Sequence, residues 1–128
     1  MEYENFYGGK GDAVIELTST DFDLKKKQVK HEEFKGKMGL IMVYAPWCGH
    51  CRNMIDVWKD LAGQFRYRFV IGAVNSENIN AKNVDVIKGF KVKYYPTVKF
   101  VNEKGKVTKF DGLLTKDDLL YFISSKGF

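Results

Sequence analysis

An unbroken apolar run at residues 40–45 is the feature that most limits the fold of this chain. Its length suits a β-strand, and consecutive apolar side chains are typical of a strand buried on both faces, as in a parallel sheet. Directly after it, from residue 49 to 65, apolar side chains recur at helical spacing, which predicts a long amphipathic helix. A buried strand followed at once by such a helix favours an α/β fold.

The remainder of the chain continues this alternation of strands and helices. Four further segments have the composition and length of strands: 14–17, 68–74, 97–101 and 106–110. Polar segments with an apolar side predict helices at 18–34 and 78–89, and Thr115 is placed to cap a last helix. Together they predict an α/β fold in which a central mixed sheet has helices on both faces. A parallel half precedes a C-terminal antiparallel hairpin and helix.

The composition describes a chain that can fold without covalent or metal cross-links. It has 128 residues, which suits one compact domain, and 45% of them are hydrophobic. The two cysteines of the chain, Cys48 and Cys51, are so close in sequence that a disulfide between them would close too small a loop to stabilise the fold. Chemistry therefore explains the pair better than stability, with two buried packing cysteines as the alternative.

The net charge of +5 does not by itself indicate a nucleic-acid-binding protein. Lysines gather between residues 25 and 37, but glutamates interrupt them and no nucleic-acid-binding module accompanies them. We interpret this segment as a solvated helix and loop, and we expect no nucleic-acid partner. No segment reaches the roughly 18 consecutive apolar residues of a membrane helix, so we expect no membrane association either.

The ends of the chain lead to an expectation about compartment that depends on whether the chain is complete. The first residues lack the basic start and apolar run of a signal peptide, and the last residues carry no retention or lipidation signal. For a complete protein we expect an intracellular, cytoplasmic location. For a piece of a longer secretory protein we expect the lumen of the endoplasmic reticulum.

The segment Cys48-Gly49-His50-Cys51 stands where the predicted buried strand ends and the helix begins. This edge of an open α/β sheet is where such folds place their sites. Free backbone N–H groups and the helix dipole stabilise a cysteine of the first helical turn as a thiolate. We therefore expect Cys48 to be the nucleophile and Cys51 to resolve the mixed disulfide, while a protonated His50 stabilises the thiolate.

A metal site is the alternative use of the two thiols. A closed zinc site needs four ligands, and Cys48 and Cys51 supply two. His50 lies inside the motif, where its reach to the same metal is awkward, and His31 is distant in sequence. We predict no metal within one chain, and a metal or cluster shared between two chains stays open.

Residues 45–51, with the sequence APWCGHC, resemble the active site of the protein disulfide isomerase branch of the thioredoxin superfamily. Three further segments resemble other parts of that family: 14–18, 90–100 and 111–113. The resemblance implies a thioredoxin fold over residues 11–128, preceded by an N-terminal extension at residues 1–10.

The resemblance also implies how substrates bind. In the family a cis-proline faces the cysteine pair, and the residue before it pairs its backbone with an extended substrate peptide. These positions are Pro96 and Tyr95 here, and the plain start of a strand is the alternative role of Pro96. The implied substrate-binding residues are Trp47, Gly49, Tyr95, Pro96 and Thr97.

The implied function is that of an enzyme, a thiol–disulfide oxidoreductase of the disulfide isomerase kind. It would form or rearrange disulfides in cysteine-containing protein substrates, with no cofactor beyond the cysteine pair. We expect a monomer that is recycled by glutathione or by a partner oxidoreductase. Two alternatives remain open: a thioredoxin-like reductase, which usually has Gly-Pro between its cysteines, and a substrate-binding or chaperone module without catalysis.

Four positions depart from the family pattern. The buried carboxylate that the family places six residues before the first cysteine is Met42 here, and its accompanying lysine is Ala73. The arginine before the last helix is Leu113, and the helix-kinking proline is Asp56, which helical geometry places on the surface. Without the acid, Cys51 lacks its usual proton acceptor, so we expect slowed resolution and longer-lived mixed disulfides.

Overall fold

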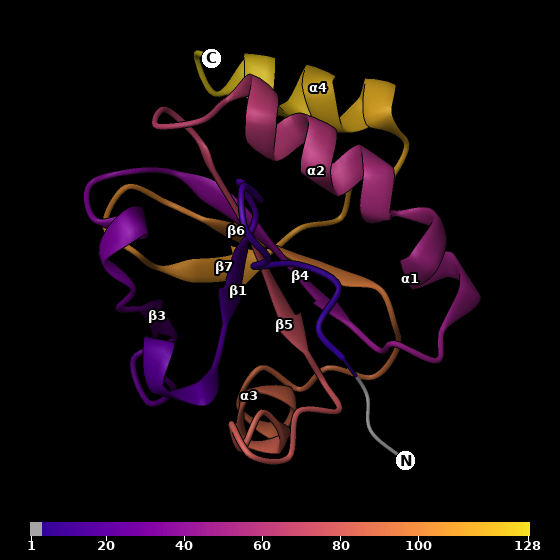
Figure 1. Ribbon diagram of the computed structural model, residues 1–128. Coiled ribbons are helices and arrows are strands. Elements are labelled where there is room, and N and C mark those ends of the chain that lie inside the picture. Colours follow the sequence, from indigo (N-terminus) through magenta and orange to yellow (C-terminus); the bar gives the residue numbers. More distant parts are fainter. Residues whose placement is uncertain (1–3) are drawn as a thin grey trace.

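The computed structural model describes residues 4–128, which form a central sheet with helices against both faces (Figure 1). The sheet has five strands in the spatial order β1-β5-β4-β6-β7. Their bounds are Ile15–Leu17 for β1, Gly39–Tyr44 for β4, Val70–Asn75 for β5, Thr97–Val101 for β6 and Val107–Lys109 for β7. Strands β1 and β4 run parallel to β5, whereas β6 is antiparallel to β4, and β7 is antiparallel to β6. The predicted parallel half and C-terminal hairpin are confirmed.

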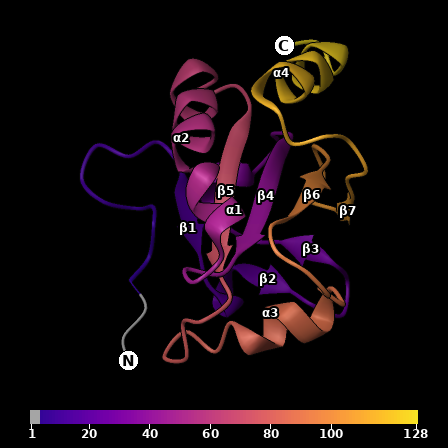
Figure 2. The same cartoon turned by 90° about the vertical axis from the view of Figure 1, so that its right-hand side faces the viewer.

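Different elements cover the two faces of the sheet, as Figure 2 shows. One face packs against α2 (Ile55–Gln64) and α4 (Lys116–Ser125). The other packs against α3 (Val84–Gly89) and a small hairpin made of β2 (Phe22–Asp23) and β3 (Gln28–Val29). The prediction of helices on both faces is therefore confirmed.

Strand β4 is buried along its whole length, as its apolar run predicts. Met42 and Tyr44 lie in the apolar cluster that packs against α2 and α4, whereas Ile41 and Val43 lie in the cluster on the opposite face. Because consecutive residues of a strand point to opposite faces, this one run supplies core side chains on both sides of the sheet.

The helix predicted at residues 18–34 is wrong. The segment instead contains two short 3₁₀ helices, Ser19–Asp21 and Glu32–Phe34, on either side of β2 and β3. Phe22 and Val29 pair across the hairpin and are buried, and Lys27 between them has a positive φ of 55°, which an α-helix excludes. The many lysines suit a solvated helix, but burial of two apolar side chains against the sheet outweighs that preference.

The other predicted elements form, although some of their ends differ. The helix predicted at 49–65 is divided at Met54 into α1 (Gly49–Asn53) and α2. Turns replace the first part of the helix predicted at 78–89, so α3 is short. The side chain of Thr115 caps α4, as predicted.

An N-terminal segment, residues 5–8, packs against β1 and β4. Tyr7 is buried, and the ring of Phe6 stacks on that of Tyr44 with 4.6 Å between the ring centroids. The amide N–H of Phe6 also donates a hydrogen bond to the Tyr44 hydroxyl at 2.9 Å. Part of the predicted extension is thus built into the core, while its residues 1–3 lie outside the described residues. The division of the chain after residue 10 stays a prediction.

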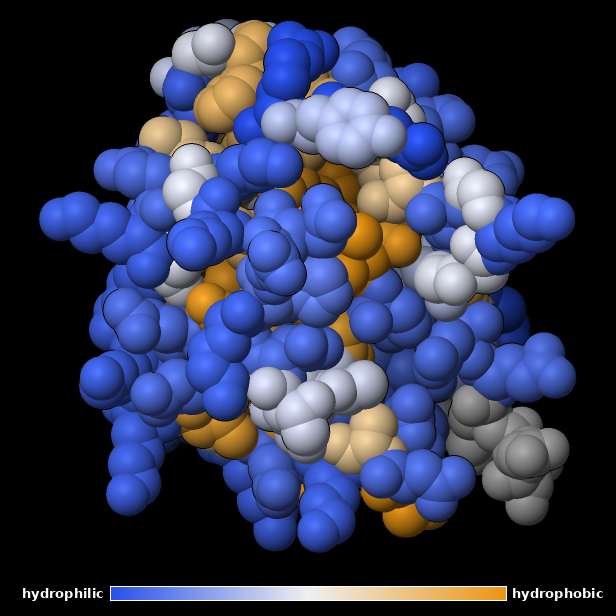
Figure 3. Space-filling model, turned by 60° about the vertical axis from the view of Figure 1, so that its left-hand side comes forward, coloured by the Kyte–Doolittle hydropathy of each residue, from blue (hydrophilic) through white to orange (hydrophobic). Residues whose placement is uncertain are grey.

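The surface is mainly polar on the face shown in Figure 3, where hydrophilic side chains predominate and apolar patches are small and separated. Along residues 4–128, no helix combines the length and the apolar character that crossing a membrane requires.

Candidate active site

The two cysteines lie where the C-terminal end of β4 leads into α1. Cys48 is the N-cap residue of α1, and its Sγ accepts a hydrogen bond from the amide N–H of Cys51 at 3.4 Å. Both cysteines are free thiols, and Cys48 is partly exposed, whereas Cys51 is fully buried. The site therefore consists of an accessible sulfur with a buried one behind it.

The surroundings of Cys48 favour its thiolate. Burial opposes ionisation, but hydrogen bonds from the Cys51 thiol and from the backbone amides of Cys51 and His50 outweigh it and lower the pKa of Cys48. The positive charge of Arg52 acts in the same direction. Its Nη1 is held near the site by a hydrogen bond to the carbonyl oxygen of Pro46, 3.2 Å away. More of Cys48 is therefore in the nucleophilic thiolate form at neutral pH.

Cys51 has the opposite environment. Burial, together with the neighbouring sulfur of Cys48, raises the pKa of Cys51 to about 12. A thiol of this acidity stays protonated at neutral pH unless another group accepts its proton. The pair thus joins a partly exposed thiol whose pKa is lowered to a buried thiol whose pKa is raised.

A second loop lies against the cysteine pair. The Tyr95–Pro96 peptide bond is cis, and the carbonyl oxygen of Tyr95 accepts a hydrogen bond from the Cys48 thiol, 3.7 Å away. Trp47 is 54% exposed and meets the ring of Tyr95 edge-on. Pro96 is buried and Thr97 is half-buried. The two segments that carry the predicted substrate-binding residues therefore meet beside Cys48, through the Tyr95 carbonyl and the contact between Trp47 and Tyr95.

A groove of about 620 Å³ runs beside this loop and is lined in part by the exposed His50. Its charged lining residues are Lys91, Lys93, Lys99, Lys109 and Asp111. Lys99 of β6 lies directly opposite Lys109 of β7. Burial, and then the charge of Lys109, lowers the pKa of Lys99. The groove therefore attracts anionic groups to the edge of the active site.

The positions that depart from the family pattern fall into two groups. Met42 and Ala73 are fully buried and are paired across β4 and β5. Leu113 is exposed, and Asp56 is exposed in the first turn of α2, which confirms it as a surface carboxylate. None of the four places a charge in the core near Cys51.

One polar feature of the core is missing from the sequence-based prediction. Glu16 of β1 lies in the same row of the sheet as Ala73 and Met42, and it accepts a hydrogen bond from the Tyr44 hydroxyl. Burial raises the pKa of Glu16 to about 8. The signal in the sequence is a lone carboxylate among the apolar residues of the strand predicted at 14–17, which a half-exposed strand explains equally well.

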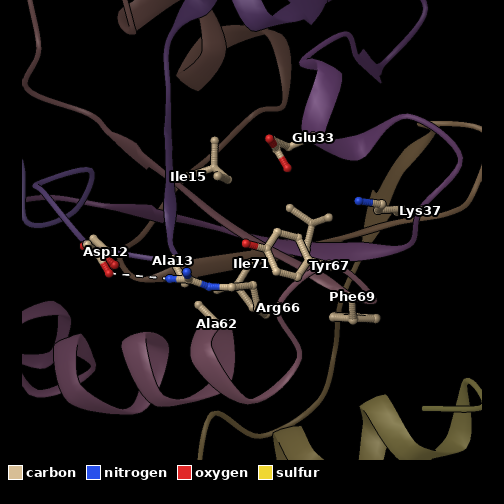
Figure 4. A pocket seen from close by; sticks show the side chains of 12 residues that line it. Asp12, Ala13, Ile15, Glu33, Lys37, Ala62, Arg66, Tyr67, Phe69 and Ile71 are labelled. Carbon is tan, nitrogen blue, oxygen red and sulfur yellow. Dashed lines mark hydrogen bonds between the residues drawn. The ribbon is translucent and has the colours of Figure 1, made fainter.

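The pocket drawn in Figure 4 lies apart from the cysteine pair. It measures about 210 Å³ and lies beside the N-terminal ends of β1 and β5, with Asp12, Arg66 and Tyr67 among its lining residues. Neither cysteine lines it. In the part of the chain that the structure describes, no three His, Cys, Asp or Glu side chains gather closely enough to hold a metal ion. The cysteine pair is therefore the candidate active site.

Known proteins with similar sequences identify the family. The family model described as Thioredoxin matches residues 13–125. A protein disulfide-isomerase A6 homolog from Drosophila melanogaster is 32% identical over 119 residues, which cover 90% of this chain and 25% of that protein. A protein disulfide-isomerase from Zea mays is 40% identical over 90 residues, which cover 69% of this chain and 17% of that protein. The chain thus spans a quarter or less of the length of these relatives.

Solved structures share the fold. The J-Trx1 fragment of ERdj5 has a TM-score of 0.68 at 22% identity, covering 89% of this chain and 51% of that one. The short form of thioredoxin f from spinach chloroplast has a TM-score of 0.66 at 20% identity, covering 88% of this chain and 91% of that one. These similarities confirm the predicted thioredoxin fold. Because the family model and the disulfide-isomerase relatives agree, the chain belongs to the thioredoxin family, with a domain like those of the protein disulfide isomerases.

Proposed function

We propose that this protein is a thiol–disulfide oxidoreductase that forms or rearranges disulfides in cysteine-containing protein substrates. The observation that carries the proposal is the arrangement at Cys48. Its sulfur is accessible, lies 3.7 Å from the carbonyl oxygen of Tyr95, and has the buried thiol of Cys51 behind it. An accessible thiolate next to a second thiol is suited to disulfide exchange, because one sulfur attacks while the other completes or reverses the reaction.

The proposed exchange has two steps. In the oxidising direction a substrate thiolate attacks Sγ of Cys48 in the Cys48–Cys51 disulfide. The bond between the two protein sulfurs breaks, and its electron pair leaves on Cys51, which takes up a proton. A second substrate thiolate then attacks the substrate sulfur of the mixed disulfide, and Cys48 leaves as a thiolate. The substrate loses two electrons, the protein gains them, and glutathione disulfide or a partner oxidoreductase takes them up again.

The residues around the accessible sulfur are proposed to bind the substrate chain. Trp47 and Tyr95 offer an apolar platform, and the backbone from Tyr95 through Pro96 to Thr97 is suited to pair with an extended peptide. Gly49 is exposed, and no atom lies within 4 Å of the place where its Cβ would be, so a substrate can approach the helix start closely. The lysines of the adjacent groove favour peptides with acidic residues near the reacting cysteine.

The direction of electron flow distinguishes this proposal from a thioredoxin-like reductase. The protein is equilibrated in buffers with a graded ratio of reduced to oxidised glutathione. The free thiols of Cys48 and Cys51 are then alkylated and counted by mass spectrometry. We expect a reduction potential near about −180 mV, the range of protein disulfide isomerase. A potential near about −270 mV, the range of thioredoxin, would replace the proposal by that of a reductase.

Trapping of the mixed disulfide tests the proposed roles of the two cysteines. Cys51→Ser should accumulate a covalent complex with a reduced and unfolded test protein in the presence of an oxidant, because Cys51 can no longer attack the mixed disulfide and release the substrate. Cys48→Ser is the matched control and should form none. If the double variant Cys48→Ser, Cys51→Ser assisted refolding as well as the natural chain, a binding or chaperone module without catalysis would be the better description.

A further inference from the structure

A polar cluster without a role in the steps above is buried on the same side of the sheet as Cys51. Tyr7, Tyr44 and Cys51 belong to one buried cluster, and the Tyr44 hydroxyl donates a hydrogen bond to Oε1 of Glu16. The second carboxylate oxygen, Oε2, and the Tyr7 hydroxyl are buried and have no hydrogen-bond partner among residues 4–128. Buried polar atoms without partners are uncommon because each costs free energy, so the pair requires an explanation.

We propose that Glu16 exchanges a proton with Cys51 through the hydroxyl of Tyr7, which makes Glu16 a proton-exchange residue of the disulfide reaction. The inference rests on the proposed function. When Cys51 attacks a mixed disulfide, the Tyr7 oxygen accepts the thiol proton while Tyr7 passes its own proton to the Glu16 carboxylate. The sulfur of Cys51 then bonds to Sγ of Cys48, and the substrate sulfur leaves with the electron pair of the broken bond. When Cys51 is the leaving group, the same proton returns to it.

The register of the sheet places the carboxyl group on the required side. Glu16 is paired with Ala73, and Ala73 is paired with Met42. Paired residues of neighbouring strands point to the same face, and Met42 and Ala73 belong to the buried cluster that contains Cys51. Since both of these neighbours are apolar, Glu16 supplies the carboxyl group of this row.

The hydroxyl of Tyr7 is buried in the cluster that contains Cys51 and makes no hydrogen bond within residues 4–128, so it is free to bond with either group. Burial, followed by the charges of Glu16 and Cys51, raises the pKa of Tyr7. The charge on either partner therefore acts on this hydroxyl. The Tyr7 ring is fixed by an edge-on contact with the ring of Tyr44, with 5.5 Å between the centroids. A phenol whose ring is held in this cluster and whose hydroxyl has no other partner is suited to relay a proton between the two groups.

The acidity of the carboxyl group suits the exchange. Burial raises the pKa of Glu16 to about 8, and the hydrogen bond from the Tyr44 hydroxyl acts in the opposite direction by favouring the ionised form. A group that titrates close to neutral pH can both give and take a proton during turnover.

Neighbouring elements add two further charged groups. Asp12, in the loop before β1, raises the pKa of Glu16 further. Lys59 of α2 pairs with Asp12, with 3.8 Å between Nζ and Oδ2, and offsets part of that negative charge. From α1 the cluster is faced by Cys51 itself, so the thiol is the titrating partner on that side.

The test measures two steps of the oxidation of the protein separately. The first step is formation of a mixed disulfide at Cys48, and the second step is attack of Cys51 on that mixed disulfide. Reduced protein is mixed with glutathione disulfide, and samples are quenched with acid at successive times. Mass spectrometry then gives the fractions of protein with a mixed disulfide at Cys48 and with the Cys48–Cys51 disulfide. We expect the rate of the first step in Glu16→Gln to stay within about twofold of the natural rate. The rate of the second step should fall about 10²-fold, as expected when proton-transfer help is lost. The pH–rate profile of the second step in the natural chain should have an inflection near the pKa of Glu16, and the profile of Glu16→Gln should lack it.

Three further variants separate proton exchange from a structural role. Tyr7→Phe keeps the ring and removes a hydroxyl without a described partner, so it should fold at least as stably as the natural chain and still slow the second step. Glu103→Gln removes an exposed carboxylate in a turn and should change neither step. Adding Met42→Glu to Glu16→Gln returns a carboxylate to the same row and should restore the second step.

The possible outcomes have distinct meanings. Equal second-step rates and pH profiles in the natural chain, Glu16→Gln and Tyr7→Phe would overturn the inference, and the slowed resolution expected from Met42 would then hold. An equal slowing of both steps in Glu16→Gln would overturn it as well, because the residue would act on the fold. Failure of the first step in the natural chain would instead overturn the proposed function.

Discussion

Trp47 and Tyr95 meet edge-on beside Cys48, with ring centroids 5.8 Å apart and ring planes at 90°. The contact joins two segments that are distant in sequence, the turn before α1 and the loop before β6. Such T-shaped pairs contribute about 0.5–1.5 kcal/mol beyond their buried area.

Trp47→Ala should therefore weaken substrate binding more than it weakens the fold. We expect KM for a peptide disulfide to rise about tenfold, which corresponds to about 1.4 kcal/mol. The unfolding free energy should fall by about 1 kcal/mol, and the alkylation rate of Cys48 should stay unchanged. Steady-state kinetics and denaturation curves measure both effects. Tyr121→Ala removes an exposed aromatic residue of α4 and serves as the control.

The burial of Glu16 predicts a stability that falls as pH rises. The pKa of Glu16 is raised from 4.5 to about 8. Between these values the folded chain holds a proton that the unfolded chain has lost, so this group lowers the unfolding free energy by about 1.4 kcal/mol per pH unit. Glu16→Gln should flatten that slope in urea titrations between pH 5 and pH 8. Parallel slopes for the two proteins would contradict the burial of this carboxyl group.

Gly8 should resist substitution because of its backbone and its neighbour. Its φ is +88°, and an added Cβ would lie 2.9 Å from the Cβ of Glu16. Gly8→Ala should lower the unfolding free energy by about 2 kcal/mol. Gly9→Ala is the matched control, since nothing lies within 4 Å of its added Cβ. It should change stability by about 0.5 kcal/mol or less. Equal effects of the two variants would show that Gly8 does not press on Glu16.

Cys48 should react with alkylating reagents at a pH below that of an ordinary cysteine. Hydrogen bonds to its sulfur and the charge of Arg52 outweigh burial and lower the pKa of Cys48. Its thiolate stabilises the reduced fold above the unfolded pKa, and this contribution is lost as pH falls through the lowered value. Arg52→Gln should move the alkylation profile to higher pH. If the pH profile of alkylation were unchanged in Arg52→Gln, the hydrogen bonds alone would account for the lowered pKa of Cys48.

The lysine pair in the groove predicts a variant that is more stable and less selective. Lys99 and Lys109 lie directly opposite each other, and like charges in this arrangement cost about 0.2–1 kcal/mol. Lys99→Gln should raise stability by about that amount and raise KM for peptides with acidic flanks, most clearly at low salt. Neutral peptides should be unaffected, and Lys25→Gln, at an exposed site away from the groove, should change neither quantity. If Lys99→Gln raised KM equally for neutral peptides, the groove would bind peptides by shape and not by charge.

Local sequence patterns predict most of this fold because the elements that build it carry their own signals. The apolar run at 40–45 and the helical spacing at 49–65 depend on neighbours in sequence, and both appear in the structure. The hairpin of β2 and β3 was missed because its burial depends on two residues only, Phe22 and Val29. Lysine-rich sequence around them is compatible with a helix as well as with a solvated turn.

The site divides in the same way. The cysteine pair and its strand-to-helix position follow from sequence order, whereas the environment of Glu16 depends on contacts between distant segments. Tyr44, which donates to its carboxyl group, is 28 positions away. The N-terminal segment that covers it has no strong local pattern. The pairing of β1 with β5, which brings Glu16 into the row of Met42, becomes visible only when the strands are placed.

The in-register pairing of β1, β5 and β4 has a consequence for how relatives of this protein are compared. Glu16, Ala73 and Met42 are neighbours across the sheet, although the chain places them far apart. A comparison of position 42 alone finds no carboxyl group, whereas the register of the sheet finds one in the same row, on the edge strand β1. In homologues with an apolar residue at the position of Met42, the residue to examine is therefore the one in the first strand that occupies the same row of the sheet as Glu16.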